Sequence, residues 1–214
     1  MADKETALIV GAGSGLSASL ARLCAGEGMA VAIAARNTEK LASLCDGTGA
    51  KAYVCDAVDG AQVDQLFDAV SSDLGVPDFV VYNASARARG PIVEVERDAV
   101  LNAVMVSCYA GFLIGQKAAQ LMLPRGSGSI FFTGASASVK GYPQSAPFAM
   151  GKFGLRGLAQ AMARELAPQN IHIGHFVIDG GISKGPDDPR ATRSLSGGAD
   201  ADAVTDSLLD PEAI

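Results

Sequence analysis

Short apolar runs rich in valine, alanine and isoleucine recur along the 214-residue chain, separated by longer stretches of helical periodicity. The runs predict strands at residues 7–10, 30–34, 50–54, 79–82, 129–132 and 171–178. The stretches between them predict helices at residues 15–25, 38–44, 61–72, 95–123 and 149–166. Because the strands are apolar throughout, helices should cover both faces of their sheet. The pattern predicts an α/β fold, a single-domain doubly wound parallel sheet that binds ligands at the carboxyl ends of its strands.

The alternation of strands and helices stops near residue 182, and the composition changes with it. Glycine, serine, proline and aspartate dominate residues 183–202, which predicts a mobile loop. Residues 211–214 have the pattern of a helix start. We therefore expect one domain over residues 1–182, followed over residues 183–214 by a flexible substrate-loop region and the start of a C-terminal helix. The pattern leaves open whether the protein is short or the chain is incomplete.

Composition and charge exclude several classes of protein. With 49% hydrophobic and 19% charged residues, the chain has enough apolar side chains to form a folded core. The formal net charge is −6, and most of the negative charge lies beyond Gly185. A nucleic acid or an anionic membrane surface would require basic patches instead. We therefore expect neither as a partner.

One stretch, residues 99–116, carries no charge and is long enough to suggest a membrane span. Polar and small residues such as Asn102 and Ser107 interrupt it, and Lys117 follows. This pattern favours a helix buried between other helices.

The cysteines and the N-terminus bear on the cellular compartment. The four cysteines form no CxxC pair and no metal-like spacing with the two histidines, so we expect no metal site. No signal-peptide pattern precedes the first apolar run, because Lys4 and Glu5 lead directly into it. Both observations favour a reduced, cytoplasmic protein.

A glycine-rich turn follows the first predicted strand and runs directly into a helical pattern. Glycines allow a tight turn and a close approach of the backbone to a pyrophosphate, while the start of the helix supplies partial positive charge. Such turns also occur without a ligand, so the motif alone leaves the function open. The candidate phosphate-binding residues are Gly11, Gly13, Ser14, Gly15 and Leu16.

Further segments, in the same order along the chain, resemble those of the short-chain dehydrogenase/reductase family. Gly11 and Gly15 match two glycines of the family's motif, whereas Ser17 stands in place of the third. The resemblance covers most of residues 7–182 and implies a dinucleotide-binding Rossmann domain. It also implies hydride transfer between a nicotinamide cofactor and a small carbonyl or alcohol substrate. Beyond the glycine turn, the cofactor contacts that it implies are Asp56, Ala57, Asn83, Ala84, Lys152 and Ile182.

The end of the second predicted strand bears on the choice of cofactor. An acidic side chain at this place would bind the adenosine ribose hydroxyls and repel a 2′-phosphate. This chain has no acid there and has Arg36, whose guanidinium suits phosphate oxygens. We therefore expect NADP(H) rather than NAD(H). The alternative is that Arg36 caps the following helix or is simply solvated.

The catalytic positions are where the chain departs from the family. The family uses a tyrosine with a lysine four residues later, and the lysine lowers the tyrosine pKa. Here Lys152 is present, but Phe148 takes the tyrosine position and has no proton to exchange. The family's serine aligns with Ala135, and its assisting asparagine aligns with Ser107. Lys152 has a second role in the family, binding the nicotinamide ribose. The alternative for Lys152 is an exposed helix lysine.

Another group could carry the proton in place of the missing tyrosine. Tyr142 lies on the loop before the Phe148 helix, although a packed loop aromatic is the simpler interpretation. Ser136 adjoins the lost serine position and could orient a carbonyl. His172 and His175 lie three residues apart in a strand, so they should face opposite sides of the sheet.

Two function classes therefore stay open. The first is an NADP(H)-dependent oxidoreductase of short-chain dehydrogenase/reductase type. The second is a cofactor-binding protein with little turnover, acting as a regulator or partner subunit. The uncharged stretch 99–116 and the apolar helix over residues 153–167 carry more apolar residues than one sheet face can cover. Because these two helices pair across a twofold axis in the family, we expect a homodimer or a homotetramer.

Overall fold

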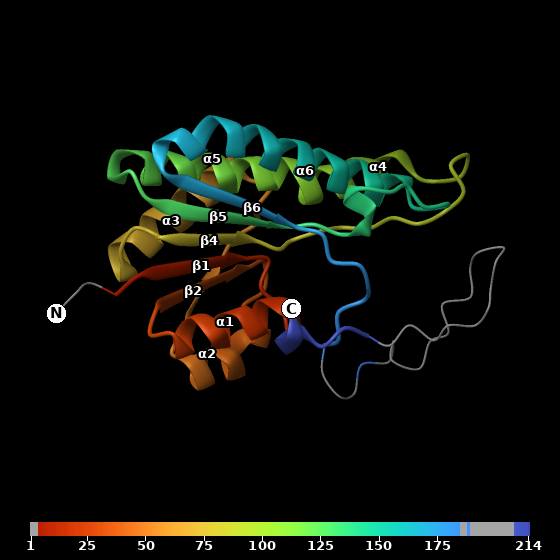
Figure 1. Cartoon of the computed structure of the whole chain (residues 1–214). Coiled ribbons are helices and arrows are strands. Elements are labelled where there is room, and N and C mark those ends of the chain that lie inside the picture. Colours follow the sequence, from red (N-terminus) through yellow and green to blue (C-terminus); the bar gives the residue numbers. More distant parts are fainter. Residues whose placement is uncertain (1–3, 185–187, 189–207) are drawn as a thin grey trace.

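The computed structural model describes residues 4–184, 188 and 208–214 of the chain. Six parallel strands form one sheet in the order β3-β2-β1-β4-β5-β6 (Figure 1). This confirms the doubly wound parallel sheet that the apolar runs predict. The strands are β1 (Thr6–Val10), β2 (Ala30–Ala35), β3 (Lys51–Val54), β4 (Phe79–Tyr82), β5 (Gly128–Thr133) and β6 (Ile171–Phe176).

Helices cover the sheet on both faces (Figure 1). Helices α1 (Leu16–Gly26) and α2 (Ala42–Thr48) lie on one face, and a 3-10 turn (Glu39–Leu41) precedes α2. The other face packs against α3 (Gly60–Leu74), α5 (Ala110–Met122) and α6 (Ala146–Leu166), and α4 (Arg97–Val104) packs against α6.

Alternate residues of the central strand serve the two cores. In β1, Leu8 and Val10 pack with α3, α5 and α6, whereas Ala7 and Ile9 pack with α1 and α2. All four side chains are buried. A strand that is apolar at every position is therefore required at the centre of this sheet.

The long helix predicted over residues 95–123 is interrupted. A π-helical turn (Met105–Tyr109) separates α4 from α5. The hydroxyl of Tyr82, on β4, donates a hydrogen bond to the carbonyl of Val106 within this turn. A carbonyl engaged from the sheet fits a local departure from regular α-helical bonding, and such turns recur at functional sites.

By length and composition alone, the helical stretch Arg97–Arg125 could cross a membrane, with a mean hydropathy of 1.5. It is the one such stretch among the residues that the structure describes. Core helices of soluble proteins pass the same test. Here Ala110, Ile114 and Met122 are buried in the core against the sheet, so the apolar composition has a packing role in this fold.

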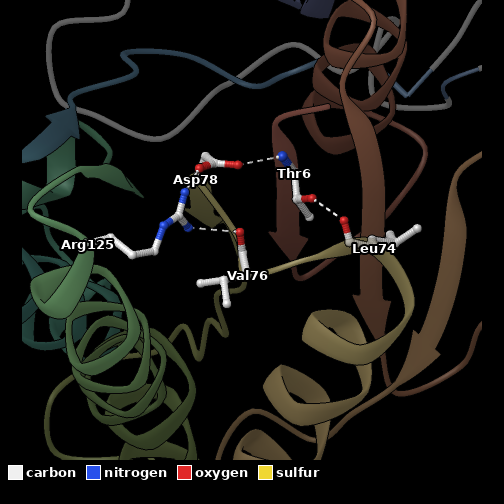
Figure 2. A network of polar contacts seen from close by, with 5 residues as sticks. All are labelled: Thr6, Leu74, Val76, Asp78 and Arg125. Atoms are coloured by element: carbon white, nitrogen blue, oxygen red, sulfur yellow. Dashed lines mark hydrogen bonds and ion pairs between the residues drawn. The ribbon is translucent and has the colours of Figure 1, made fainter. Parts of the chain in front are cut away.

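A polar network fixes the amino ends of β1 and β4 (Figure 2). The carboxylate of Asp78 accepts a hydrogen bond from the Thr6 amide at 2.8 Å and pairs with Arg125. The Thr6 hydroxyl donates to the Leu74 carbonyl at 2.7 Å, and Arg125 donates to the Val76 carbonyl at 3.1 Å. This network lies at the amino ends of the strands, whereas the glycine-rich turn lies at their carboxyl ends. Its role is therefore structural.

The end of the chain returns to the glycine turn and α1 (Figure 1). Ile182 and Leu209 form a parallel bridge, and Glu212 pairs with Arg22 of α1 at 2.5 Å. The helix start expected at residues 211–214 is a short 3-10 helix, Pro211–Ala213. Most of the loop predicted to be mobile lies outside the described residues. The sixth strand ends at Phe176, two residues earlier than predicted.

Candidate active site

The glycine-rich turn is pressed against the loop that follows β4. The amides of Gly11 and Ala12 both donate to the Ala34 carbonyl at 2.9 Å. Gly11 has a φ of +89°, and a Cβ there would lie 2.4 Å from the Ala84 nitrogen. Only glycine fits this position. The turn therefore brings the predicted residues Gly11, Asn83 and Ala84 together.

Ser17 connects this turn to β4. Its hydroxyl donates to the Gly11 carbonyl at 3.1 Å and accepts from the Asn83 side-chain amide at 2.7 Å. The serine in the third glycine position is therefore buried and hydrogen-bonded in both directions. The sequence shows only that Ser17 stands in the place of the third glycine. The signal was the residue type, because serine hydroxyls readily bond backbone groups near a helix start.

The start of α1 suits a phosphate group. Gly15 caps the helix and supplies no side-chain hydrogen bond, and a Cβ on Gly13 would meet no atom within 4 Å. Uncapped amides at a helix start beside open space form an anion site. A cavity of about 440 Å³ adjoins Ser14, and its lining includes Arg22 and Ser183 together with the acidic residues Asp210 and Glu212. The amides at the start of α1 suit a pyrophosphate, whereas the acidic side chains of the C-terminal segment do not. Leu16 is buried and Ile182 lies beside Gly15.

The candidate adenosine contacts follow the neighbouring strands. Arg36 is exposed just beyond Ala34, the residue whose carbonyl holds the glycine turn. The side-chain oxygen of Asn37 accepts a hydrogen bond from the Glu39 amide at 3.0 Å, at the start of the 3-10 turn before α2. The side chain that caps there is thus Asn37, which counts against a capping role for Arg36.

Asp56 follows β3 and is fixed by two hydrogen bonds. Its amide donates to the Gln62 side chain at 3.0 Å, and its carboxylate accepts from the Val58 amide at 3.3 Å. The intervening Ala57 is buried. The structure thus places Asp56 and the glycine-rich turn at the carboxyl ends of the parallel strands. The contact of Asp56 with adenine stays a prediction.

Lys152, on α6, is buried at the end of the candidate site that lies away from the adenosine contacts. It is only 3% exposed, and its Nζ donates to the Thr133 carbonyl at 2.6 Å. The interpretation as an exposed lysine is therefore wrong. The Phe148 ring, one helical turn away, has its centroid 5.8 Å from this nitrogen. Burial, and then the positive charge of Arg87, lower the pKa of Lys152 to about 8.

Arg87 is a site residue that sequence reasoning missed. Its Cζ lies 4.0 Å from the centroid of the Phe148 ring. The residue before it, Ala86, is held through both backbone groups by the buried Ser107 hydroxyl, at 3.1 and 3.2 Å. Ser107 is the position that aligns with the family's asparagine. Arg87 belongs to no recognisable motif, and its contact with Phe148 joins residues far apart in the sequence.

The two substitute proton donors lie in different surroundings. Ser136 begins a short 3-10 turn after β5, in which the Ala135 amide donates to the Ser138 hydroxyl at 3.1 Å. Tyr142 is 40% exposed, and the ring contact that the structure describes for it is with Lys140, at 5.3 Å. No described contact joins either side chain to Lys152, so both roles stay predictions.

The two histidine side chains lie in different environments. His172 is exposed and its ring contacts Phe131 at 5.5 Å. His175 is partly buried near α6, where burial, Lys152 and Arg156 lower its pKa. Within residues 4–184, 188 and 208–214, no three potential metal ligands gather.

Comparison with known proteins defines the class to which this fold and site belong. The family model described as short chain dehydrogenase matches residues 5–183. The chain belongs to this family of oxidoreductases.

One relative and two solved structures that resemble the chain are also named as dehydrogenases. Gluconate 5-dehydrogenase from Gluconobacter oxydans is 30% identical over 172 residues, which cover 78% of this chain and 67% of that protein. A short-chain dehydrogenase structure from Rhodopseudomonas palustris is 37% identical with a TM-score of 0.74, covering 80% of this chain and 84% of that one. A gluconate 5-dehydrogenase from Burkholderia cenocepacia, in complex with NADP and tartrate, is 30% identical with a TM-score of 0.78. That match covers 85% of this chain and 73% of that one. The chain spans 62–68% of the length of several curated relatives.

Proposed function

We propose that the chain is an NADP(H)-dependent oxidoreductase that transfers hydride to or from a small carbonyl or alcohol substrate. The observation that carries this proposal is Lys152, buried and held on Thr133 at the same sheet edge as the glycine turn. An ammonium group costs free energy to bury, so a folded protein keeps one in this position most readily for a function.

Arg36 supports NADP(H) over NAD(H). It is exposed beside the glycine turn, where a 2′-phosphate would lie in this family, and its guanidinium can form bidentate charged hydrogen bonds. The neighbouring gluconate 5-dehydrogenase structure contains NADP, and an actinorhodin ketoreductase of 28% identity was solved with NADPH.

The proton must come from a group other than residue 148. A bound NADPH would supply the hydride, and the protein would deliver a proton to the carbonyl oxygen. Lys152, with a pKa of about 8, is protonated at neutral pH and close enough to its own pKa to release a proton. We therefore place the proton on the Lys152 Nζ. Tyr142 and Ser136 are the alternatives.

A second candidate function is a cofactor-binding regulator or partner subunit with little turnover. The observation that favours it is the pair Phe148 and Ala135, which lack the hydroxyls that the family uses. A positioned acid–base group contributes about 10²–10⁴-fold to the rate. A site with no replacement for it would bind the cofactor and turn over slowly.

We also propose that the protein is cytoplasmic and forms a homodimer or homotetramer. Five large apolar side chains are exposed on α6 and on the stretch from α4 to α5, which is unusual for a monomer. They are Leu101, Tyr109, Phe112, Met150 and Phe153.

Parallel titrations with NADPH and NADH, and turnover with a panel of small carbonyls, test the proposed function. NADPH should bind at least about tenfold more tightly, because a charged hydrogen bond contributes roughly 1.5–3 kcal/mol. Arg36→Asp should reverse the preference. Arg164→Asp, a change of an exposed arginine near the end of α6, is the matched control and should leave it intact. Equal affinities in the parent protein would refute the NADP(H) assignment.

A further inference from the structure

Two basic side chains meet over one aromatic ring in the candidate site. The Arg87 guanidinium lies 4.0 Å from the Phe148 centroid, and the Lys152 ammonium lies 5.8 Å from it. Phe148 and Lys152 are buried, whereas Arg87 is exposed. Arg87 therefore lies on the solvent side of this cluster.

The position of Arg87 is built by the surrounding loops. The Ser107 hydroxyl accepts from the Ala86 amide and donates to the Ala86 carbonyl, which fixes the backbone next to Arg87. A Cβ on Gly151 of α6 would lie 2.6 Å from the Ser107 Cβ, so α6 packs closely on this serine. The Gly90 amide also donates to the Gln144 carbonyl at 3.1 Å, which joins the loop to the segment before α6.

The charges around the site favour an anion. The charged group that the structure describes as acting on Lys152 is Arg87 from the loop after β4, while Lys152 and Arg156 of α6 both act on His175 of β6. All of these are basic, and the positive charge of Arg87 disfavours the ammonium form of the buried Lys152. A carboxylate placed on the solvent side of Arg87 would offset that charge.

The chemistry of arginine narrows the choice of anion. A guanidinium stacked on a ring keeps its N–H groups at the edge, where they can form two parallel hydrogen bonds to a carboxylate. Arg87 has other interactions in the structure, which a substrate carboxylate would share or displace. Because the guanidinium lies within 4.0 Å of the ring beside Lys152, a group bound to it would hold the substrate next to the proton donor.

We propose that Arg87 binds a carboxylate of the substrate, so that the site acts on small oxo acids and hydroxy acids. This inference rests on the proposed function and names the substrate class of the same site. Arg87 is then a specificity-determining residue, and neutral carbonyls and polyols of the same size are poor ligands.

Binding of an anion should also couple to protonation. A carboxylate on Arg87 offsets the positive field at Lys152, so Lys152 should take up a fraction of a proton on ligand binding near pH 8–9. A purely structural Arg87 would not produce this uptake. Calorimetry in buffers of different ionisation enthalpy measures it directly.

Calorimetric titration of the NADP⁺-saturated protein with three matched pairs of ligands tests the proposal. The pairs are tartrate with threitol, lactate with propylene glycol, and gluconate with sorbitol. At least one acid should bind on the order of tenfold more tightly than its neutral partner. Arg87→Met should remove that difference, and Arg87→Lys should restore part of it. Arg89→Met, an exposed arginine in the same loop, is the matched control and should change nothing.

The outcomes separate this inference from the proposed function. Equal binding of each acid and its neutral partner, or acid binding that is unchanged in Arg87→Met, overturns the carboxylate site. If NADP⁺ binding by the parent protein persists in that case, the proposed function stands without it. Absence of NADP⁺ and NADPH binding by the parent protein refutes the proposed function itself. Circular dichroism of each variant verifies that it is folded.

Discussion

Replacing Lys152 by methionine should change the dependence of stability on pH in a way that no exposed lysine can. In the folded protein the pKa of Lys152 is about 8, because burial and Arg87 disfavour the ammonium form, against an ordinary value of 10.5. The unfolded chain therefore holds this proton to higher pH than the folded protein does. Between about pH 8 and pH 10.5, unfolding takes up a proton, so the free energy of unfolding of the parent protein rises with pH through this window.

The magnitude follows from the size of the shift. Each pKa unit corresponds to about 1.4 kcal/mol, so the burial of the ammonium costs about 3 kcal/mol below pH 8. Lys152→Met removes this cost but leaves the Thr133 carbonyl without its donor, a loss of about 1–3 kcal/mol. At pH 7 the variant should therefore be as stable as the parent or up to about 2 kcal/mol more stable. Truncating a well-packed core side chain would instead destabilise by about 2–5 kcal/mol.

Urea unfolding, followed by circular dichroism from pH 7 to pH 10, measures this effect. The stability of the parent relative to Lys152→Met should rise by about 2–3 kcal/mol across that range. Other titrating groups cancel in the difference. Lys40→Met, a change of an exposed lysine before α2, is the matched control and should show no such rise. A pH-independent difference between the parent and Lys152→Met would refute the burial of a charged lysine at this site.

Three further predictions concern the cofactor turn, the catalytic pair and the amino-end network. Gly11→Ala should abolish NADPH binding and destabilise the fold by at least about 2 kcal/mol in urea unfolding, because of its positive φ and contact with backbone. Gly13→Ala, which meets open space, should keep the stability of the parent. Phe148→Tyr combined with Ala135→Ser should raise carbonyl reduction by about 10²-fold in steady-state assays if the parent site lacks a strong acid; no gain would indicate that another group already supplies the proton. Asp78→Ala should lower the free energy of unfolding by about 1–3 kcal/mol without changing NADPH affinity, since it breaks a charged hydrogen bond far from the cofactor turn.

The sheet and its order of elements could be predicted from the sequence because they depend on patterns that extend over many residues. A buried parallel strand needs apolar side chains on both faces, and Ala7–Val10 of β1 and Phe79–Val81 of β4 meet this requirement. Element boundaries were less predictable. The π-helical turn contains the Val106 carbonyl that accepts from Tyr82, 24 positions earlier, and no local pattern encodes this contact.

The residues of the candidate site likewise differ in how far the sequence could identify them. Gly11 and Lys152 belong to short motifs, so the sequence could identify them. Arg87 and Ser17 act through contacts with the distant residues Phe148 and Asn83, and only the folded chain brings these together. The burial of Lys152 likewise depends on β5 packing against α6. The sequence could therefore identify the motif residues but not the contacts of Arg87 and Ser17.

The central claim is that this site transfers hydride although residue 148 is a phenylalanine. The most direct test is NADPH that carries two deuterium atoms at C4 of the nicotinamide, incubated with the parent protein and a panel of small oxo acids and neutral carbonyls. Our account predicts deuterium on the former carbonyl carbon of an oxo acid product, one per NADPH consumed, seen by mass spectrometry and lost in Lys152→Met. Tight NADPH binding with no deuterium in any product would contradict it and establish the non-catalytic function.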